Sequence, residues 1–309
     1  TRNFPSREGS KPGSGQLAGV ALMDARSIAA TTANGGILTP ATDIDYDPTV
    51  PEYQYDASSY DTRVYQGFGK GDYDALLKLG PNIKDWPEIA PLGDNLLLKV
   101  VSYITDPVTT TDELIPSGET SSYRSNPERL SEFALSRRDP QYVSRSKVMR
   151  QIERDREAGK ALPEEVLNVY AALTKAGVKN DPAHTDIGST IFANMPGDGS
   201  AREQAASCQK VLGGWANIAN EYATKRYRSN LINWGMLPFL IPAGDLPFAN
   251  GDYLFFPQVR KAVADKVDSI TGYVVKADGL KEFQVTLGEL TDDEREIILK
   301  GCLINYNRR

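Results

Sequence analysis

The chain has little cysteine and little histidine. Cys208 and Cys302 are its two cysteines among 309 residues, and His184 is its single histidine. Two cysteines cannot build the disulfide framework of a small secreted domain, and no Cys-x-x-Cys ligand pair is present. His184 stands in a polar segment, which favours a solvated side chain over an acid or base. The composition suits a reducing compartment, and we expect the cytoplasm or, in a eukaryote, the mitochondrial matrix.

Long hydrophobic runs and an excess of positive charge are also missing. No apolar stretch approaches the length that spans a bilayer, so the sequence does not indicate membrane insertion. The formal net charge is -6 at pH 7, whereas a general binder of phosphate backbones would present a basic surface. We therefore expect no membrane association and no nucleic-acid partner. The length allows one large domain or two modest ones.

Three segments of different character follow one another. Residues 1–44 contain a predicted helix over 25–33 and a short predicted strand over 35–38, and they resemble one unit of a larger α/β domain. Residues 45–81 are rich in Asp, Tyr, Pro and Gly without a sustained period, which indicates an extended linker. Residues 82–309 alternate apolar runs with amphipathic segments, which predicts a mixed α/β domain. Residues 291–294 (Thr-Asp-Asp-Glu) predict a capping box for a last helix that carries Ile297, Ile298 and Cys302.

The most informative stretch is residues 197–202, Gly-Asp-Gly-Ser-Ala-Arg. Apolar residues over 190–193 predict a strand before it, and residues 201–212 predict a helix after it. Ser200 would then cap the helix, where unpaired N–H groups and the helix dipole attract negative charge. This position favours a bound carboxylate or a deprotonated serine. Serine is also a common helix cap without chemistry, and the spacing of a hydrolase nucleophile elbow is absent because Arg202 replaces its glycine.

Several arginines could clamp a polycarboxylate through bidentate hydrogen bonds. The four candidates are Arg2, Arg7, Arg124 and Arg202. Each one by itself is also compatible with an ordinary surface arginine, and the sequence does not show that the four converge.

Four motifs in a fixed order resemble the aconitase superfamily. Residues 1–7 (Thr-Arg-Asn-Phe-Pro-Ser-Arg) are similar to its Asn-Arg-Asn-Phe-x-Gly-Arg motif, and residues 110–118 (Thr-Thr-Asp-Glu-Leu-Ile-Pro-Ser-Gly) are similar to its Thr-Thr-Asp-His-Ile-Ser segment. Residues 197–203 are similar to the Gly-x-Gly-Ser-Ser-Arg-Glu signature of its C-terminal swivel domain. Residues 222–238 are similar to the run that follows this signature, with Phe-Ala-Arg-Ile, Asn-Leu and Gly-Leu-Leu-Pro. The ordered set is far more specific than any single motif.

The resemblance implies a fold and an activity. It implies an α/β swivel domain with mixed β/α layers at 82–309, preceded by the linker at 45–81 and, at 1–44, by the tail of an α/β domain on the cluster-binding side. In such hydro-lyases a 4Fe-4S cluster is the Lewis acid for the hydroxyl of a citrate-like hydroxy polycarboxylate, and a serine alkoxide removes the neighbouring proton. The cluster cysteines precede the first motif in the family. We therefore expect cluster-binding domains upstream of Thr1, no metal ligand within this chain, and no activity from the chain alone.

The resemblance also implies roles for individual residues. Ser200 falls at the position of the base, Arg202 at the arginine that stabilises the serine anion, and Asp112 at an active-site aspartate. The carboxylate-binding positions are occupied by Arg2, Arg7 and Arg124.

Four residues depart from the family motifs. Thr1 replaces an asparagine, Glu113 and Gln204 each replace a histidine, and Ala201 replaces the second serine. These departures motivate an alternative hypothesis, in which the protein is a degenerate aconitase relative that binds a metabolite, iron or RNA without catalysis. Three correctly spaced cysteines upstream of the chain would favour the enzyme, and their loss would favour the binding protein.

Overall fold

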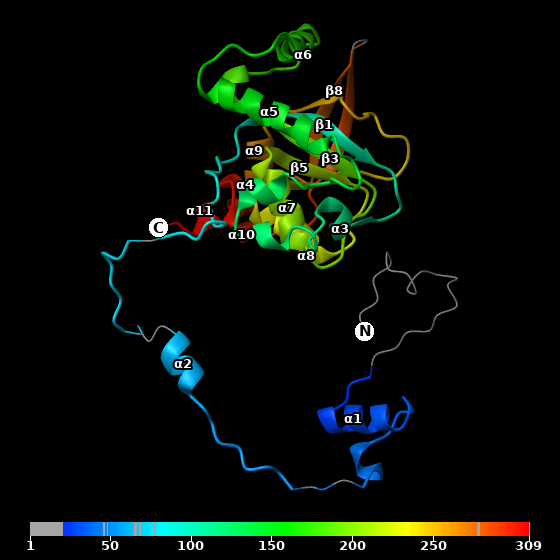
Figure 1. Cartoon of the computed structure of the whole chain (residues 1–309). Coiled ribbons are helices and arrows are strands. Elements are labelled where there is room, and N and C mark those ends of the chain that lie inside the picture. Colours follow the sequence, from blue (N-terminus) through cyan, green and yellow to red (C-terminus); the bar gives the residue numbers. More distant parts are fainter. Residues whose placement is uncertain are drawn as a thin grey trace. The chain divides into compact units, whose positions relative to one another are not determined.

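The computed structural model describes residues 21–308, apart from 46, 48, 65, 66, 68, 77, 277 and 278. The chain divides into two compact units, with the boundary between Lys78 and Leu79 (Figure 1). The first motif, with Arg2 and Arg7, lies outside the described residues. Among the helices of the described part, none has the length and apolar character needed to cross a membrane.

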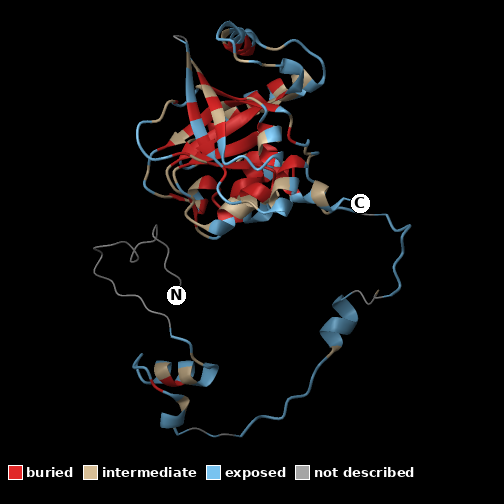
Figure 2. Ribbon diagram, turned by 180° about the vertical axis from the view of Figure 1, so that it is seen from behind, coloured by how far each residue is buried: buried red, intermediate tan, exposed pale blue. Residues whose placement is uncertain are grey.

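The described part of the first unit has little core. It contains the helices α1 (Ala25–Ala33) and α2 (Ser58–Arg63) and the 3-10 turn η1 (Ala41–Asp43). The predicted helix over 25–33 is confirmed, whereas the predicted strand over 35–38 is wrong because α1 ends in a turn in which Gly35 and Gly36 take φ values of 65° and 87°. Apart from Ala30 and Thr39, the described residues up to Lys78 are at least partly exposed (Figure 2).

The second unit is built around a closed barrel. Its strands lie in the order β1 (Asn95–Ile104), β3 (Thr185–Ala193), β5 (Gly214–Ala219), β6 (Leu237–Leu240), β9 (Gly279–Thr286), β8 (Ser269–Lys276) and β7 (Tyr253–Phe256). The first four strands pair in parallel, and the remaining pairs are antiparallel. The predicted α/β class is confirmed. The sequence did not predict that the sheet closes on itself.

Alternation of side chains along β1 builds two hydrophobic clusters. Leu97 and Val101 belong to the cluster that includes residues of the covering helices, whereas Leu96 and Leu98 belong to a second cluster. In that second cluster the rings of Phe239 on β6 and Phe256 on β7 stack with centroids 4.8 Å apart. Because β6 and β7 are not neighbours in the barrel, these rings meet across its interior.

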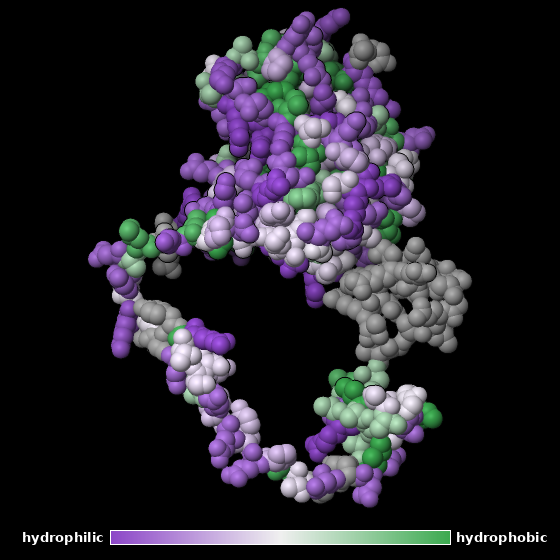
Figure 3. All heavy atoms as spheres, in the orientation of Figure 1, coloured by the Kyte–Doolittle hydropathy of each residue, from purple (hydrophilic) through white to green (hydrophobic). Residues whose placement is uncertain are grey.

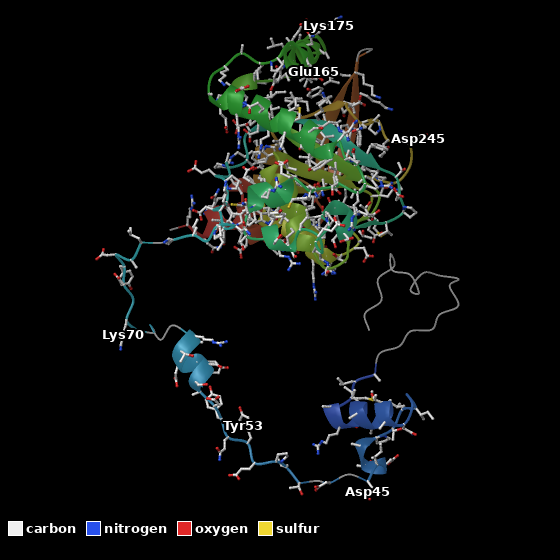
Figure 4. The ribbon with its side chains drawn as sticks, viewed as in Figure 1. Asp45, Tyr53, Lys70, Glu165, Lys175 and Asp245 are labelled. Carbon is white, nitrogen blue, oxygen red and sulfur yellow. The ribbon has the colours of Figure 1, made fainter. Side chains whose placement is uncertain are left out.

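Helices connect the parallel strands and cover the barrel. The long ones are α5 (Tyr142–Glu157), α6 (Glu164–Lys175), α7 (Arg202–Val211), α8 (Lys225–Asn233) and α10 (Asp292–Leu299). Shorter helical segments are α3 (Thr111–Leu114), α4 (Pro127–Ser131), α9 (Val259–Ala264), α11 (Leu303–Asn307), η2 (Ser121–Tyr123) and η3 (Pro182–His184). The amphipathic helix α6 is anchored to β1 by an ion pair of 2.5 Å between Lys99 Nζ and Glu165 Oε1, and Figure 4 labels Glu165 on this helix.

The last helices show one confirmed and one wrong prediction. Thr291 and Glu294 form the predicted capping box of α10, because the Thr291 hydroxyl accepts from Glu294 N at 3.2 Å and the Glu294 carboxylate accepts from Thr291 N at 2.8 Å. Cys302 was expected on the same helix, but α10 ends at Leu299 and Cys302 is the N-cap of α11.

Hydrophilic side chains cover much of the visible surface of the second unit (Figure 3).

Candidate active site

The Ser200 loop, residues 197–201, lies between the short strand β4 (Pro196–Asp198) and α7. β4 pairs in parallel with β2 (Thr109–Thr110), so that Thr109 faces Pro196 and Thr110 faces Asp198. This ladder places the 110–118 motif beside the 197–203 motif, although 86 residues separate Thr111 from Gly197 in the sequence. Two of the predicted motifs are therefore adjacent in space.

Two glycines allow the loop to lie close to its neighbours. A Cβ atom at Gly199 would lie 2.1 Å from Thr111 Oγ1, and a Cβ atom at Gly197 would lie 2.4 Å from the ring of Tyr227. Their φ values are +137° and +101°, which side chains rarely adopt. The loop is thus packed between α3 and α8, and both glycines are required by conformation and by space.

Thr224, from the 222–238 motif, joins three parts of the site through one hydroxyl. It donates to the carbonyl of Gly197 at 3.2 Å and accepts from Arg202 Nε at 3.2 Å and from Tyr227 N at 3.2 Å. One donor and two acceptor positions are the full capacity of a threonine hydroxyl. The third described motif therefore fixes the backbone of the Ser200 loop and the side chain of Arg202 together.

Residues of the 222–238 motif also bind Glu203, the last residue of the 197–203 motif. Trp234 Nε1 donates to the Glu203 carboxylate at 3.1 Å. The side-chain amide of Asn230, oriented with its nitrogen toward the Arg226 carbonyl, accepts from Glu203 N at 3.2 Å. One of the N–H groups at the start of α7 is therefore satisfied from α8.

Ser200 and Arg202 have opposite environments. The Ser200 side chain is exposed, whereas Arg202 is 7% exposed and runs beneath the loop to Thr224. The prediction that Ser200 caps the helix is wrong, because α7 begins at Arg202 and Ala201 is its N-cap, without a side-chain capping bond. The β2–β4 ladder keeps the backbone extended to Asp198, and Gly199 then turns it, so the helix starts later than expected. The Ser200 hydroxyl has no capping role.

Asp112 lies on α3, next to the threonine that contacts Gly199. Its carboxylate binds Arg137 Nη1 at 2.5 Å, and the other terminal nitrogen of Arg137 binds Glu119. The hydrogen bond that Arg137 donates to Glu119, together with the charge of Asp112, raises the pKa of Arg137. Arg137 was not predicted, because it belongs to none of the motifs and lies 25 residues after its partner.

Glu113 closes a capping box on α3. Its carboxylate accepts from Thr110 N at 2.7 Å and from Thr110 Oγ1 at 2.8 Å, and Glu113 N donates to the same hydroxyl at 3.1 Å. The residue that replaces the family histidine thus holds the helix that supports the Ser200 loop.

Arg124 is not brought to the Ser200 loop. Its exposed guanidinium makes a long hydrogen bond of 3.4 Å to the carbonyl of Ser117, and among the described residues no contact joins it to residues 197–202. The structure therefore gathers Ser200, Arg202 and the α3 segment that carries Asp112, whereas Arg2 and Arg7 lie outside the described residues.

The cysteines of this chain do not fit a 4Fe-4S cluster. Cys208 and Cys302 are buried, and burial raises the pKa of the Cys208 thiol, although cluster ligation requires several thiolates. In the described ranges no group of three or more His, Cys, Asp or Glu residues is placed to hold a metal ion. His184 is exposed and contacts Asp181 at 2.8 Å, in keeping with the predicted solvated side chain.

Comparison with known families agrees with this arrangement. Residues 180–244 match the family model of the aconitase C-terminal domain, and this span includes the 197–203 motif and most of the 222–238 motif. This segment of the chain is similar to an aconitase C-terminal domain. The superfamily resemblance inferred from the motifs is confirmed at the level of this domain, and the match supports a hydro-lyase role at the level of the family.

Two further comparisons add little. A search of curated proteins finds no match to this chain. Among solved structures, 3-isopropylmalate dehydratase from Methanocaldococcus jannaschii is 20% identical, with a TM-score of 0.42, over 69% of this chain and 92% of that one. This likeness is too weak to support a conclusion about the aconitase-type domain.

Proposed function

We propose that this chain supplies the proton-abstracting half of an aconitase-like hydro-lyase active site, with Ser200 as the base. The observation that carries the proposal is the packing of three separate motif segments around one loop. Thr111 contacts Gly199, and Thr224 binds both Gly197 and Arg202. The loop is rigidly supported, while its serine hydroxyl remains exposed.

The chemistry assigned to Ser200 needs positive charge close by. A serine hydroxyl is a very weak acid, and its anion forms only where cations or N–H donors stabilise it. We assign this role to Arg202, which lies two residues away and whose Nε binds Thr224. The Ser200 alkoxide would take a proton from the carbon next to the hydroxyl-bearing carbon, the C–H electrons would form the double bond, and hydroxide would leave.

The remaining roles follow the family pattern. Asp112 is an active-site carboxylate whose position is set by Arg137. Arg2, Arg7 and Arg124 are assigned to the carboxylates of a citrate-like hydroxy polycarboxylate, since guanidinium groups match carboxylates in a bidentate manner. For Arg124, which does not contact the Ser200 loop in the structure, this assignment rests on the resemblance alone. The 4Fe-4S cluster is assigned to other domains of the full-length protein, because the two cysteines of this chain do not fit it.

The test is Ser200→Ala in the full-length, cluster-loaded protein. Two readouts apply, namely dehydration of citrate-like acids and exchange of the substrate proton with deuterated solvent. We expect both to fall by about 10²- to 10⁴-fold, the usual contribution of a positioned base, with an unchanged cluster spectrum. Ser229→Ala, on α8, is the matched control and should retain activity. Unchanged proton exchange in Ser200→Ala would reject Ser200 as the base.

A second measurement separates the enzyme from the alternative binding protein. The purified chain of 309 residues should show no turnover by itself, and measurable dehydration without iron would contradict this. If the full-length protein binds a tricarboxylate but neither dehydrates it nor exchanges its proton, the degenerate relative is the correct description. A salt-dependent RNA affinity would identify the RNA-binding form of that alternative.

A further inference from the structure

Helix α8 binds the two charged residues that follow Ser200, and it binds them at its opposite ends. Thr224, the N-cap of α8, accepts from Arg202 Nε at 3.2 Å. Trp234, the C-cap, donates from Nε1 to the Glu203 carboxylate at 3.1 Å. The two caps are ten residues apart in the sequence, which corresponds to about 15 Å along a helix. Because α7 and α8 lie side by side (Figure 1), a neighbouring cation and anion of α7 are drawn apart by one helix.

The indole of Trp234 is the one described partner of the Glu203 carboxylate. Among the described ion pairs, none includes Glu203. A cavity of about 360 Å³ lies beside the two residues, and its other lining residues are the uncharged Asn233, Leu303, Ile304 and Asn307. No described cation on that side therefore competes with the indole N–H for the carboxylate.

The Trp234 ring is itself held in place. Trp234 is 8% exposed, and its ring packs against that of Trp86 with centroids 4.2 Å apart. Its backbone N–H donates to the carbonyls of Asn230 and Leu231 at 3.2 and 3.1 Å. A buried indole N–H usually has an acceptor. The contact with Glu203 supplies that acceptor and also fixes the direction in which the carboxylate points.

Two other helices show where a glutamate of the first turn goes when no side chain diverts it. In α3 and α10 the carboxylates of Glu113 and Glu294 fold back and accept from the N–H groups of the N-cap residues, at 2.7 and 2.8 Å. The start of a helix attracts negative charge in this way. Folded back in the same manner, the Glu203 carboxylate would approach Ala201 and Ser200. A carboxylate there opposes formation of a serine anion, because like charges repel.

We propose that Trp234 is a positioning residue of the hydro-lyase site, which holds the Glu203 carboxylate away from Ser200 while Thr224 holds Arg202 close to the Ser200 loop. The inference rests on the proposed function, because it concerns the charges around the proposed base. With the cation kept near and the anion diverted, the local field favours the serine anion. Without the indole N–H, the carboxylate returns toward the start of α7, and the serine ionises only at higher pH.

The main experiment is Trp234→Phe in the full-length, cluster-loaded protein, with exchange of the substrate proton into deuterated solvent measured across a range of pH. Phenylalanine keeps an aromatic ring against Trp86 but has no N–H group. We expect the rate profile to move about one unit to higher pH, a loss of about tenfold below the midpoint that is recovered above it. A merely structural defect would lower the rate equally at every pH. Trp215→Phe, on β5, is the matched control and should keep the wild-type profile.

Glu203→Gln tests the cause of the shift. Glutamine removes the charge, so the double variant Trp234→Phe/Glu203→Gln should regain the wild-type profile, whereas independent structural effects would add. A shifted profile that persists in the double variant overturns the proposal. An unshifted profile in Trp234→Phe overturns it as well, and the proposed function then stands if Ser200→Ala abolishes exchange in the same assay. Full exchange in Ser200→Ala rejects both.

A measurement on the chain of 309 residues needs neither cluster nor turnover. Its three tryptophans give three indole N–H signals in a nitrogen–proton NMR spectrum, and the signal lost in Trp234→Phe is that of Trp234. Hydrogen bonds to a carboxylate are stronger than neutral ones. Glu203→Gln should therefore shift the Trp234 signal and leave those of Trp86 and Trp215 in place. An unchanged Trp234 signal overturns the proposal even if Trp234→Phe fails to fold in the full-length protein.

Discussion

The two ends of α7 each bury a cationic side chain, and the two cations are stabilised in different ways. At the N-terminal end, Arg202 is buried and its Nε binds Thr224, which also holds the loop backbone. At the C-terminal end, Lys210 is equally buried, but its nitrogen has the Trp215 ring beneath it and no described acceptor. One helix thus carries a cation fixed by polar contacts and another whose charge is poorly stabilised. The first suits permanent charge stabilisation, whereas burial lowers the pKa of the second to about 7.

Gly199→Ala should break the N-terminal end most severely. The new methyl group would meet Thr111 Oγ1 at 2.1 Å, and the backbone would have to keep a φ of +137°. We expect a stability loss of about 1–3 kcal/mol from backbone strain and a fall in turnover of about 100-fold from displacement of Ser200. Thermal unfolding and dehydration assays of the full-length protein measure the two effects. Gly118→Ala, where a Cβ atom meets nothing within 4 Å, should change neither.

Lys210→Met should remove a pH dependence of stability from the C-terminal end. The folded pKa of Lys210 is about 7, below its ordinary value, so the unfolded chain binds more protons above pH 7 and stability rises with pH. The slope reaches about 1.4 kcal/mol per pH unit for one group. Denaturant unfolding between pH 7 and about 8.5 avoids most titration of tyrosine, and the two cysteines titrate equally in the wild type and the variant. The exposed control Lys160→Met should keep the wild-type slope of unfolding free energy against pH. If Lys210→Met keeps that slope too, the pKa of Lys210 is not lowered.

Glu113→Ala tests whether α3 supports the chemistry at the N-terminal end. Loss of the capping box should cost about 1 kcal/mol of unfolding free energy. Turnover should fall as well, because α3 contacts the Ser200 loop through Thr111. Glu294→Ala removes the same kind of box from α10 and should cost a similar amount without affecting turnover. Equal effects of the two variants on turnover would show that α3 has no special role.

Arg137→Ala should have the smallest effect on stability. The ion pairs of Arg137 with Asp112 and Glu119 are exposed, and such pairs contribute little to unfolding free energy. We expect an unchanged melting temperature and a fall of a few-fold in turnover, as Asp112 loses its orientation. Lys160→Ala removes the exposed pair with Asp155 and should alter neither quantity. Full activity of Arg137→Ala would contradict the proposal that Asp112 is an active-site residue oriented by Arg137.

The sequence predicted the elements near the site well where local pattern decides them. The strand before Ser200, the helix after it and the capping box at Thr291 have clear signals in neighbouring residues, and the structure contains all three. The start of α7 was predicted too early because the pairing of β4 with β2 is a contact between distant segments. A local pattern does not contain that ladder. The site residues themselves remain predictions, and the positions of Arg2 and Arg7 lie outside the described residues.

The sequence by itself indicated the resemblance to the aconitase superfamily and the residues to which a hydro-lyase role can be assigned, because glycine, serine and arginine stand at fixed spacing in the motifs, and its alternation of apolar and amphipathic segments predicted the mixed α/β class. Only the tertiary structure decided that Thr111 and Thr224 meet at the Ser200 loop, that Arg137 binds Asp112, and that Lys210 is buried with no hydrogen-bond acceptor for its Nζ among the described residues. The physical reason is that burial and hydrogen-bond satisfaction depend on residues brought together from distant parts of the chain, and a lysine at the end of a helix has the same appearance in a sequence whether water or a tryptophan ring lies beside it.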